Sequence, residues 1–318
     1  MKIIFMGTPD FGVPVIRAIA ESGHSICTVV TQPDRPKGRG KGISVSPVKE
    51  EATRLGIPVF QPEKVKSPDS VEYIRSLSPD AIVVVAFGQI LSQEILDIPR
   101  YGCINVHASL LPKYRGAAPI QKAILEGEKV TGITTMLMDK GLDTGDILLQ
   151  EEVEINDDET GGSLFSKLSL VGAKLIITTL KGLEEGNIRP VPQQGDSSYA
   201  GMLDKTMGLI NWQTDAKTIE RQIRAMNPWP SAYTYLDGRL LKLWRSVVID
   251  GHDDMIDENV KGCLPGTVVR SDKSGIYVLT GEGVLNILEL QPEGKKRMGA
   301  DSFLRGHNIS AGTVLGEV

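Results

Sequence analysis

The sequence predicts two domains: an α/β domain with a doubly wound, mostly parallel, Rossmann-like sheet, and then a small OB-like β-barrel. The chain has 318 residues, which is more than one hydrophobic core usually contains. In the first half, apolar strand patterns alternate with helical patterns, as in doubly wound sheets. After residue 230 the pattern changes to short strands separated by turn residues, which is typical of small barrels.

The first domain is expected to span residues 1–186. Residues 81–87 are continuously apolar, which predicts a strand covered by helices on both faces. The expected strands are residues 2–6, 26–31, 81–87, 103–106, 133–138 and 147–155. The expected helices are residues 13–22, 47–55, 70–77, 117–125 and 163–184.

The second domain is expected to span residues 205–318. Residues 187–204, rich in Gly, Pro, Gln and Ser and without periodicity, predict a linker before it. Thr214 is expected to cap a helix that runs to about Met226. The expected strands are residues 232–236, 240–249, 266–271, 275–280 and 284–290.

The composition is that of a globular protein, with 41% hydrophobic and 24% charged residues. Cys27, Cys103 and Cys263 lie far apart, which argues for a reducing compartment and against a disulfide framework or a structural zinc site. The first apolar stretch is too short for a signal peptide, and no run of 18 apolar residues occurs, so we expect a cytoplasmic protein with no membrane partner. Because the net charge is −5, any nucleic-acid site requires local clustering of cations.

Residues 102–112 join a predicted strand to polar groups suited to catalysis. Asn105 and His107 are two residues apart, so they project from one face near the C-terminal end of that strand. Doubly wound sheets bind ligands at this edge. An amide beside an imidazole can donate to a carbonyl oxygen and move a proton near neutral pH. The alternative is a core Asn and His whose polar atoms are satisfied by the neighbouring backbone.

Residues 138–146 form a glycine-punctuated segment with three carboxylates between two predicted strands. Asp143 is expected to reach the His107 imidazole across the end of the sheet and to stabilise its charged form. Asp139 and Asp146 are expected to have structural roles, such as accepting backbone N–H bonds. For any single Asp in such a loop, turn chemistry is the simpler explanation.

Residues 7–12 follow the first strand and precede a helix, as a dinucleotide-binding turn does. They lack the GxGxxG spacing, and Pro9 and Phe11 occupy positions where a pyrophosphate-binding turn needs small residues. The segment therefore predicts a turn that shapes the rim of a pocket rather than a nicotinamide site.

Residues 32–42 alternate cations with Pro and Gly, and we expect neither helix nor strand there. Four cations within seven residues of an acidic domain suggest an exposed, flexible arm that contacts phosphates. A solvated surface loop is the alternative. The four cations are Arg35, Lys37, Arg39 and Lys41.

Taken together, these motifs resemble the 10-formyltetrahydrofolate-dependent formyltransferases and hydrolases, and within them the methionyl-tRNA formyltransferases. The resemblance covers the whole chain. It is carried by Asn105-x-His107, by Ser109-Leu-Leu-Pro112, by Gly141-Leu-Asp-Thr-Gly145, and by residues 7–10 (GTPD), 32–36 (QPDRP), 115–119 (RGAAP) and 227–230 (NPWP).

The resemblance implies a formyltransferase fold with Asn105, His107 and Asp143 as the catalytic residues. It implies transfer of the formyl group of 10-formyltetrahydrofolate to the α-amino group of initiator methionyl-tRNA, without a metal. The basic loop would enter the acceptor arm of the tRNA, the barrel would lie along the tRNA, and we expect a monomer. The folate would contact Phe87, Gly88, Gln89, Ile90, Leu91, Ser109, Leu110, Leu111 and Pro112.

Two other readings stay open at this stage. Sugar-nucleotide and other small-amine formyltransferases of the same fold share the catalytic trio, but they give no reason for the basic loop. A non-catalytic RNA-binding protein would explain the barrel and the loop, but not the convergence of Asn105, His107 and Asp143 on one strand end.

Overall fold

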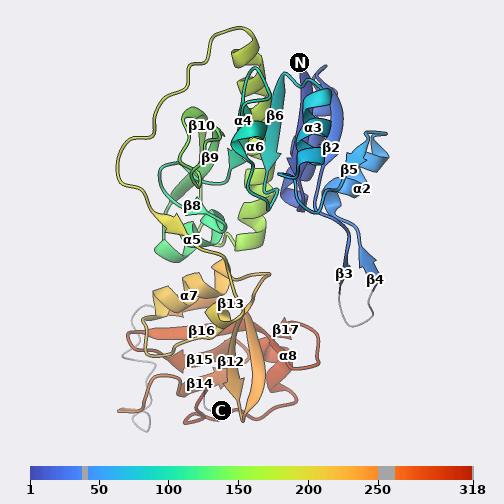
Figure 1. The fold of residues 1–318 in the computed structure, drawn as a ribbon. Helices are drawn as coiled ribbons and strands as arrows, with labels where there is room; N and C mark the ends of the chain where they lie inside the picture. Colours follow the sequence, from blue (N-terminus) through green and yellow to red (C-terminus); the bar gives the residue numbers. More distant parts are fainter. Residues whose placement is uncertain (38–41, 250–261, 317–318) are drawn as a thin grey trace. The chain divides into compact units, whose positions relative to one another are not determined.

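The structure is a computed structural model that describes residues 1–37, 42–249 and 262–316 (Figure 1). The chain forms two compact units. The first comprises Met1–Pro119, Val130–Glu154 and Phe165–Ala200. The second comprises Ile120–Lys129, Ile155–Leu164 and Gly201–Val318, so it includes two short segments from the first half of the chain.

The first unit is built on a seven-stranded sheet with the order β10-β9-β7-β6-β1-β2-β5. The five strands from β5 to β7 are parallel, whereas β9 runs antiparallel to both β7 and β10. The predicted doubly wound, mostly parallel sheet is therefore confirmed. The strands are β1 (Lys2–Gly7), β2 (Ser25–Val30), β5 (Val59–Phe60), β6 (Ala81–Val85), β7 (Cys103–His107), β9 (Val130–Leu137) and β10 (Ile147–Glu154).

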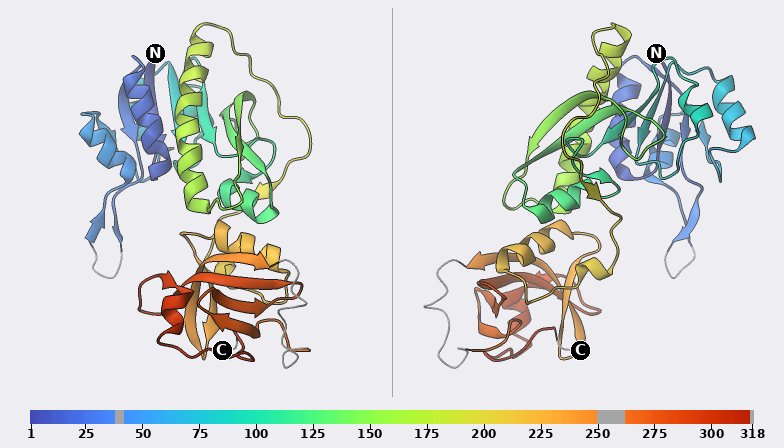
Figure 2. Two further views of the ribbon diagram at one scale, coloured as in Figure 1. Left: turned by 180° about the vertical axis from the view of Figure 1, so that it is seen from behind. Right: turned by 60° about the vertical axis from the view of Figure 1, so that its left-hand side comes forward.

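Helices cover both faces of this sheet, with α1 and α6 on one face and α3 and α4 on the other (Figures 1 and 2). This explains why all five residues of β6 are buried. Alternate residues contact opposite layers, and Ile82 and Val84 belong to the cluster that also contains residues of α3 and α4. The helices of this half of the chain are α1 (Val13–Glu21), α2 (Pro47–Arg54), α3 (Pro68–Ser76), α4 (Gln93–Leu96), α5 (Pro119–Glu126) and α6 (Gly161–Glu184).

Two of these helices begin at Ser-Pro pairs. Ser46 and Ser67 are the N-caps of α2 and α3, and each hydroxyl accepts a hydrogen bond from the backbone N–H three residues later. The proline that follows each serine stands in the first turn, where its missing N–H leaves no helical bond unmade.

Helix α6 is the one helix of the described residues that is long and apolar enough to span a membrane by length and composition. Half of its most apolar window is buried inside the protein. Thr179 of α6 is fully buried and its hydroxyl is 2.9 Å from that of Thr135 on β9. The helix thus packs on the sheet.

The basic segment 32–42 contains secondary structure, contrary to expectation. Arg35–Lys37 (β3) and Gly42–Ser44 (β4) form an antiparallel two-stranded ribbon. The prediction was wrong because Pro36 is tolerated on a strand without a second neighbour, where its missing N–H interrupts no ladder on the other side. Arg39 and Lys41 lie outside the described residues.

The second unit contains an antiparallel sheet with the order β12-β13-β16-β15-β14, and β17 pairs with β16. This confirms the predicted change to a small antiparallel β domain. Its elements are α7 (Ala216–Ala225), β12 (Ala232–Leu236), β13 (Arg239–Ile249), β14 (Val268–Asp272), β15 (Gly275–Leu279), β16 (Val284–Pro292), β17 (Met298–Gly299) and α8 (Ala300–Leu304).

Helix α7 is capped by Asp215, not by Thr214 as predicted. The Asp215 carboxylate accepts a hydrogen bond from the Thr218 backbone N–H at 2.9 Å, whereas the Thr214 hydroxyl donates to the Asn211 carbonyl. Asp and Thr are both good N-caps, and the preceding turn decides which one stands at the helix start.

We expect Glu51→Gln to lower the free energy of unfolding at neutral pH by about 1–2 kcal/mol. Glu51 is buried and its carboxylate accepts hydrogen bonds from Arg17 and Arg54, which lower its pKa from 4.5 to about 2. The arginine side chains are 49% and 60% exposed, so solvent screens the interaction.

Because the folded-state pKa of Glu51 lies below its ordinary value, this stabilisation is complete above pH 4.5 and is lost as the pH falls toward 2. Denaturant unfolding across this range measures it, with Glu50→Gln, a neighbouring exposed position, as the control. A difference between wild type and Glu51→Gln that is independent of pH would contradict the assignment.

Candidate active site

Strand β7 places Asn105 and His107 near the middle of the sheet. It lies between β6 and β9, where Asn105 pairs with Val84 on one side and Met136 on the other. His107 is buried, at 6% exposure, while Asn105 is half-buried. The two side chains share one face of the strand, because both reach the same carboxylate.

That carboxylate belongs to Asp143, whose side chain is 12% exposed. The Asn105 amide donates from Nδ2 to Asp143 Oδ1 at 3.3 Å. Asp143 Oδ2 accepts from the backbone N–H of Gly116 at 2.8 Å and lies 3.7 Å from His107 Nδ1. The structure therefore brings the three predicted catalytic side chains together.

The orientation of the His107 ring is determined by a backbone carbonyl. Nε2 lies 3.0 Å from the Tyr114 carbonyl oxygen, and because a carbonyl can only accept, Nε2 carries a proton. Nδ1 is then the nitrogen that faces Asp143. A second proton, on Nδ1, would make the ring cationic, with the Asp143 carboxylate 3.7 Å away.

The loop that carries Asp143 folds back over β7. Leu137, the last residue of β9, pairs with Ile104, so the loop begins beside the amino half of β7 rather than at its carboxyl end. The expectation that Asp143 would reach His107 across the sheet end was therefore wrong about the route, although it was right about the contact.

The returning loop is tight. Asp143 has a φ of +52°, a left-handed conformation that costs a non-glycine residue about 1 kcal/mol or more, so its surroundings must hold it there. A Cβ on Gly145 would lie 1.7 Å from the Leu137 carbonyl oxygen, so only glycine fits there. Asp139 accepts hydrogen bonds from the Gly141 N–H and the Thr144 hydroxyl, which is the structural role expected of it.

A segment expected to be a linker also contributes to the site. Tyr199–Ala200 (β11) pairs in parallel with Arg115–Gly116 (β8), the strand whose Gly116 N–H binds Asp143. Gln193 donates hydrogen bonds to backbone carbonyls of the Asp143 loop. Sequence reasoning missed these contacts, because they join residues that lie far apart in the chain; the RGAAP motif was the one available signal.

The first predicted folate-binding segment, residues 87–91, follows β6 at the carboxyl edge of the sheet. Phe87 and Leu91 are buried, whereas the Ile90 side chain is 84% exposed. Gln89 accepts from the Val65 N–H and donates to the Pro62 carbonyl, so its side chain binds the protein itself. The exposed backbone at Gly88 has a φ of +82°, a conformation suited to glycine.

The second segment, residues 109–112, follows β7. The buried Ser109 donates to the Lys113 carbonyl, and the Ser109 carbonyl accepts from the Thr134 hydroxyl. The Leu111 N–H donates to that same hydroxyl oxygen. These bonds fix the turn beside His107. Leu111 is buried, and Leu110 and Pro112 are half-buried.

Of the predicted tRNA-binding cations, Arg35 is exposed and Lys37 ends β3. The base of this ribbon is fixed by Asp34, whose carboxylate pairs with the Lys49 ammonium and accepts from the Gln61 amide at 2.9 Å. These bonds lower the pKa of Asp34, so it is ionised at neutral pH.

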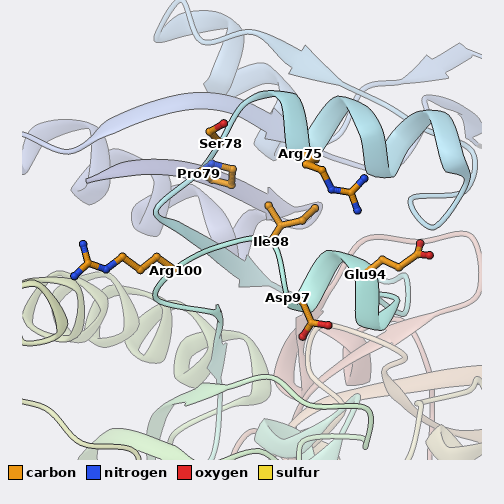
Figure 3. Close-up of a pocket in the computed structure, with 7 residues that line it drawn as sticks. All are labelled: Arg75, Ser78, Pro79, Glu94, Asp97, Ile98 and Arg100. Atoms are coloured by element: carbon orange, nitrogen blue, oxygen red, sulfur yellow. The ribbon is translucent and has the colours of Figure 1, made fainter.

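An open depression of about 590 Å³ lies elsewhere on the first unit (Figure 3). Ser78 and Pro79 precede β6, and Ile98 and Arg100 precede β7, so the depression is at the amino ends of these strands. His107 is the last residue of β7 and Asn105 is its central residue. The depression therefore plays no part in the site, since doubly wound sheets bind ligands at the carboxyl edge.

Comparison with known protein families gives two matches. Residues 1–180 match the family Formyl transferase, and residues 202–308 match Formyl transferase, C-terminal domain. The chain is 53% identical to the methionyl-tRNA formyltransferase of Agathobacter rectalis, over 99% of both chains. It is likewise 53% identical to that of Lachnospira eligens, over the full length of both.

Solved structures with the same fold are more distant in sequence. WlaRD, a sugar 3N-formyl transferase, superposes with a TM-score of 0.66 at 19% identity, over 93% of this chain and 99% of that one. HypX from Aquifex aeolicus, in complex with tetrahydrofolic acid, gives a TM-score of 0.61 at 17% identity, over 96% of this chain and 47% of that one. These likenesses concern the fold; the family matches and the full-length relatives go further, and by them the chain belongs to the formyl transferase family and, within it, to the methionyl-tRNA formyltransferases.

Proposed function

We propose that this chain transfers the formyl group of 10-formyltetrahydrofolate to the α-amino group of methionine on initiator methionyl-tRNA. The observation that carries the proposal is the convergence of Asn105, His107 and Asp143 in one half-buried cluster. The cluster lies in a chain that is about half identical to methionyl-tRNA formyltransferases from end to end. The product would be N-formylmethionyl-tRNA, used to initiate translation.

Asn105 is proposed to stabilise the negative charge that develops on the formyl oxygen. One amide N–H donates to Asp143 at 3.3 Å, and the half-buried side chain has a second N–H that can donate to the substrate. A donor held in place before the reaction stabilises the transition state without reorganisation.

His107 and Asp143 are proposed to move the protons. The amine attacks the formyl carbon and loses a proton to the Asp143 carboxylate, directly or through a water. As the bond between that carbon and N10 breaks, its electron pair stays on N10, which is protonated by the His107–Asp143 pair. Because the Tyr114 carbonyl accepts a hydrogen bond from Nε2, we assign the protonation of N10 to Nδ1 of His107.

The residues around the site fit a folate that supplies the formyl group. The exposed apolar side chain of Ile90 suits a flat heteroaromatic ring, and the exposed backbone at Gly88 allows close approach. We propose that residues 87–91 and 109–112 border this binding site. The mechanism assigns no step to a metal.

For the tRNA, we propose that the basic ribbon contacts phosphates of the acceptor arm and that the C-terminal domain, residues 205–318, also binds the tRNA. Arg35 is exposed on β3, and the ribbon is joined to the domain through Asp34. Cations on an arm with a fixed base can meet a phosphate backbone at a small cost in entropy. We further propose that the enzyme is a cytoplasmic monomer.

The deciding experiment is formyl transfer from 10-formyltetrahydrofolate to initiator methionyl-tRNA, measured beside free methionine, glycinamide ribonucleotide and an amino-sugar nucleotide. Selective formylation of the tRNA is expected. Transfer to the amino-sugar nucleotide would favour a sugar formyltransferase, and tRNA binding without transfer to any acceptor would favour a non-catalytic RNA-binding protein.

Asn105→Ala and His107→Ala are each expected to lower kcat by ~10²–10³, because each removes a group that acts on charge developing in the transition state. Single-turnover kinetics with initiator methionyl-tRNA measure this loss. Folate affinity, measured by fluorescence titration, serves as the control and should change by less than about threefold. Near-normal kcat in both variants would refute the mechanism.

Arg35→Ala and Arg39→Ala are expected to raise the KM for tRNA while leaving folate binding unchanged. Each lost phosphate contact should also flatten the dependence of log KM on log salt by about one unit of slope. Arg75→Ala is a matched control, since it removes an exposed positive charge from the same unit. An equal KM and salt slope in all four proteins would contradict the proposed arm.

A further inference from the structure

We infer that Gln193 is a positioning residue for Asp143, and thus that the segment after α6 is part of the catalytic apparatus. The inference rests on the proposed function, because it assigns Gln193 a role through a proposed catalytic carboxylate. It concerns a side chain in a stretch whose composition predicts only a linker.

Gln193 joins the Asp143 loop to β8. Its Nε2 donates to the carbonyl oxygens of Asp143 and Gly145, both at 2.8 Å. Its Oε1 accepts from the Arg115 guanidinium, at 3.2 Å from Nε and 2.7 Å from the terminal nitrogen. The amide orientation is unambiguous, because carbonyls only accept and a guanidinium only donates.

These contacts match what the Asp143 loop requires. The loop leaves β9 beside Ile104 and must fold back to bring its carboxylate to Asn105 and His107. Its turning point is Asp143, in the left-handed conformation. A residue in such a conformation persists only where the surroundings impose it. Gln193 binds the main chain at that turning point and two residues later.

The Asp143 side chain is bound from the same neighbouring strand. Gly116 of β8 donates its N–H to Asp143 Oδ2, and Arg115, the residue before it, binds Gln193. The main chain of Asp143 is thus linked to β8 through Gln193, and its carboxylate is bonded to β8 directly. Without Gln193, the hydrogen bond from the Gly116 N–H to the carboxylate would remain. The loop backbone, however, would lose the link to β8 that the Gln193 side-chain amide provides.

The hydrogen bonds of Gln193 described above go to the loop backbone and to Arg115 rather than to the reacting side chains, so its loss should act on the chemical step through the position of Asp143. We expect Gln193→Ala to lower kcat by ~10–100-fold, because displacing a catalytic group by about 1 Å can cost that much. The KM values for tRNA and folate should stay within about twofold of wild type. Gln194→Ala, at the exposed neighbouring position, is the matched control.

Gln193→Glu separates the two halves of the contact. It keeps an acceptor for Arg115 but replaces the donor to the two carbonyls with an oxygen that repels them. It should therefore be as impaired as Gln193→Ala if donation to the loop is what matters. Wild-type kcat in Gln193→Glu would overturn the inference.

A double-mutant cycle tests whether Gln193 acts through Asp143. In an Asp143→Ala background, Gln193→Ala should cause little further loss of kcat, because the group it positions is already gone. If the two losses multiply, Gln193 acts independently of Asp143 and the inference is wrong.

A readout without substrate separates this inference from the proposed function. Hydrogen–deuterium exchange of residues 139–146 should be faster in Gln193→Ala than in wild type or Gln194→Ala, whichever acceptor the enzyme uses. If wild type formylates no acceptor but exchange is faster, the proposed function fails while the positioning stands. If wild type formylates tRNA and neither exchange nor kcat changes in Gln193→Ala, the inference alone fails.

Discussion

Asp143 reaches Asn105 and His107 because the chain between β9 and β10 folds back over β7 instead of continuing past the sheet. The carboxylate then meets the Asn105 amide, the Gly116 N–H and the His107 ring within 3.7 Å. The positions of the other groups in the site depend on this reversal of the chain. Strand β8 must lie where its N–H can bind the carboxylate, and Gly145 must lack a Cβ so that the loop can pass Leu137.

Much of the site could be predicted, because its main elements are local in sequence. Strand periodicity alone places Asn105 and His107 on one face, and the continuous apolar run of β6 indicates a sheet covered on both sides. The ribbon of β3 and β4 was missed, since the local bias of Pro36 against strands is decisive only where a strand has two neighbours. The role of Gln193 was not predicted, because residues 187–204 carry no local signal for the carbonyl groups that Gln193 binds. These carbonyl groups belong to residues about 50 positions earlier in the chain.

Backbone groups provide many of the contacts to the site. The Tyr114 carbonyl fixes one His107 nitrogen, the Gly116 N–H binds Asp143, and Tyr114 in turn donates its own N–H to the Ser198 hydroxyl at 2.9 Å. Gly116 lies in a paired strand and Tyr114 stands just before it, so these backbone groups have little freedom to move and the polar side chains are oriented before any substrate arrives.

The pairing of β11 with β8 has a mechanical consequence. The chain leaves the first unit for the last time after β11, whose Ala200 carbonyl accepts bonds from the N–H groups of Ala117 and Ala118 at 2.8 and 3.3 Å. Tension along the polypeptide from Gly201 onward would meet this ladder before it meets Gln193. The short strand therefore anchors the polypeptide to β8 at the point where the chain leaves the first unit, and this anchor is the same strand that binds the Asp143 carboxylate.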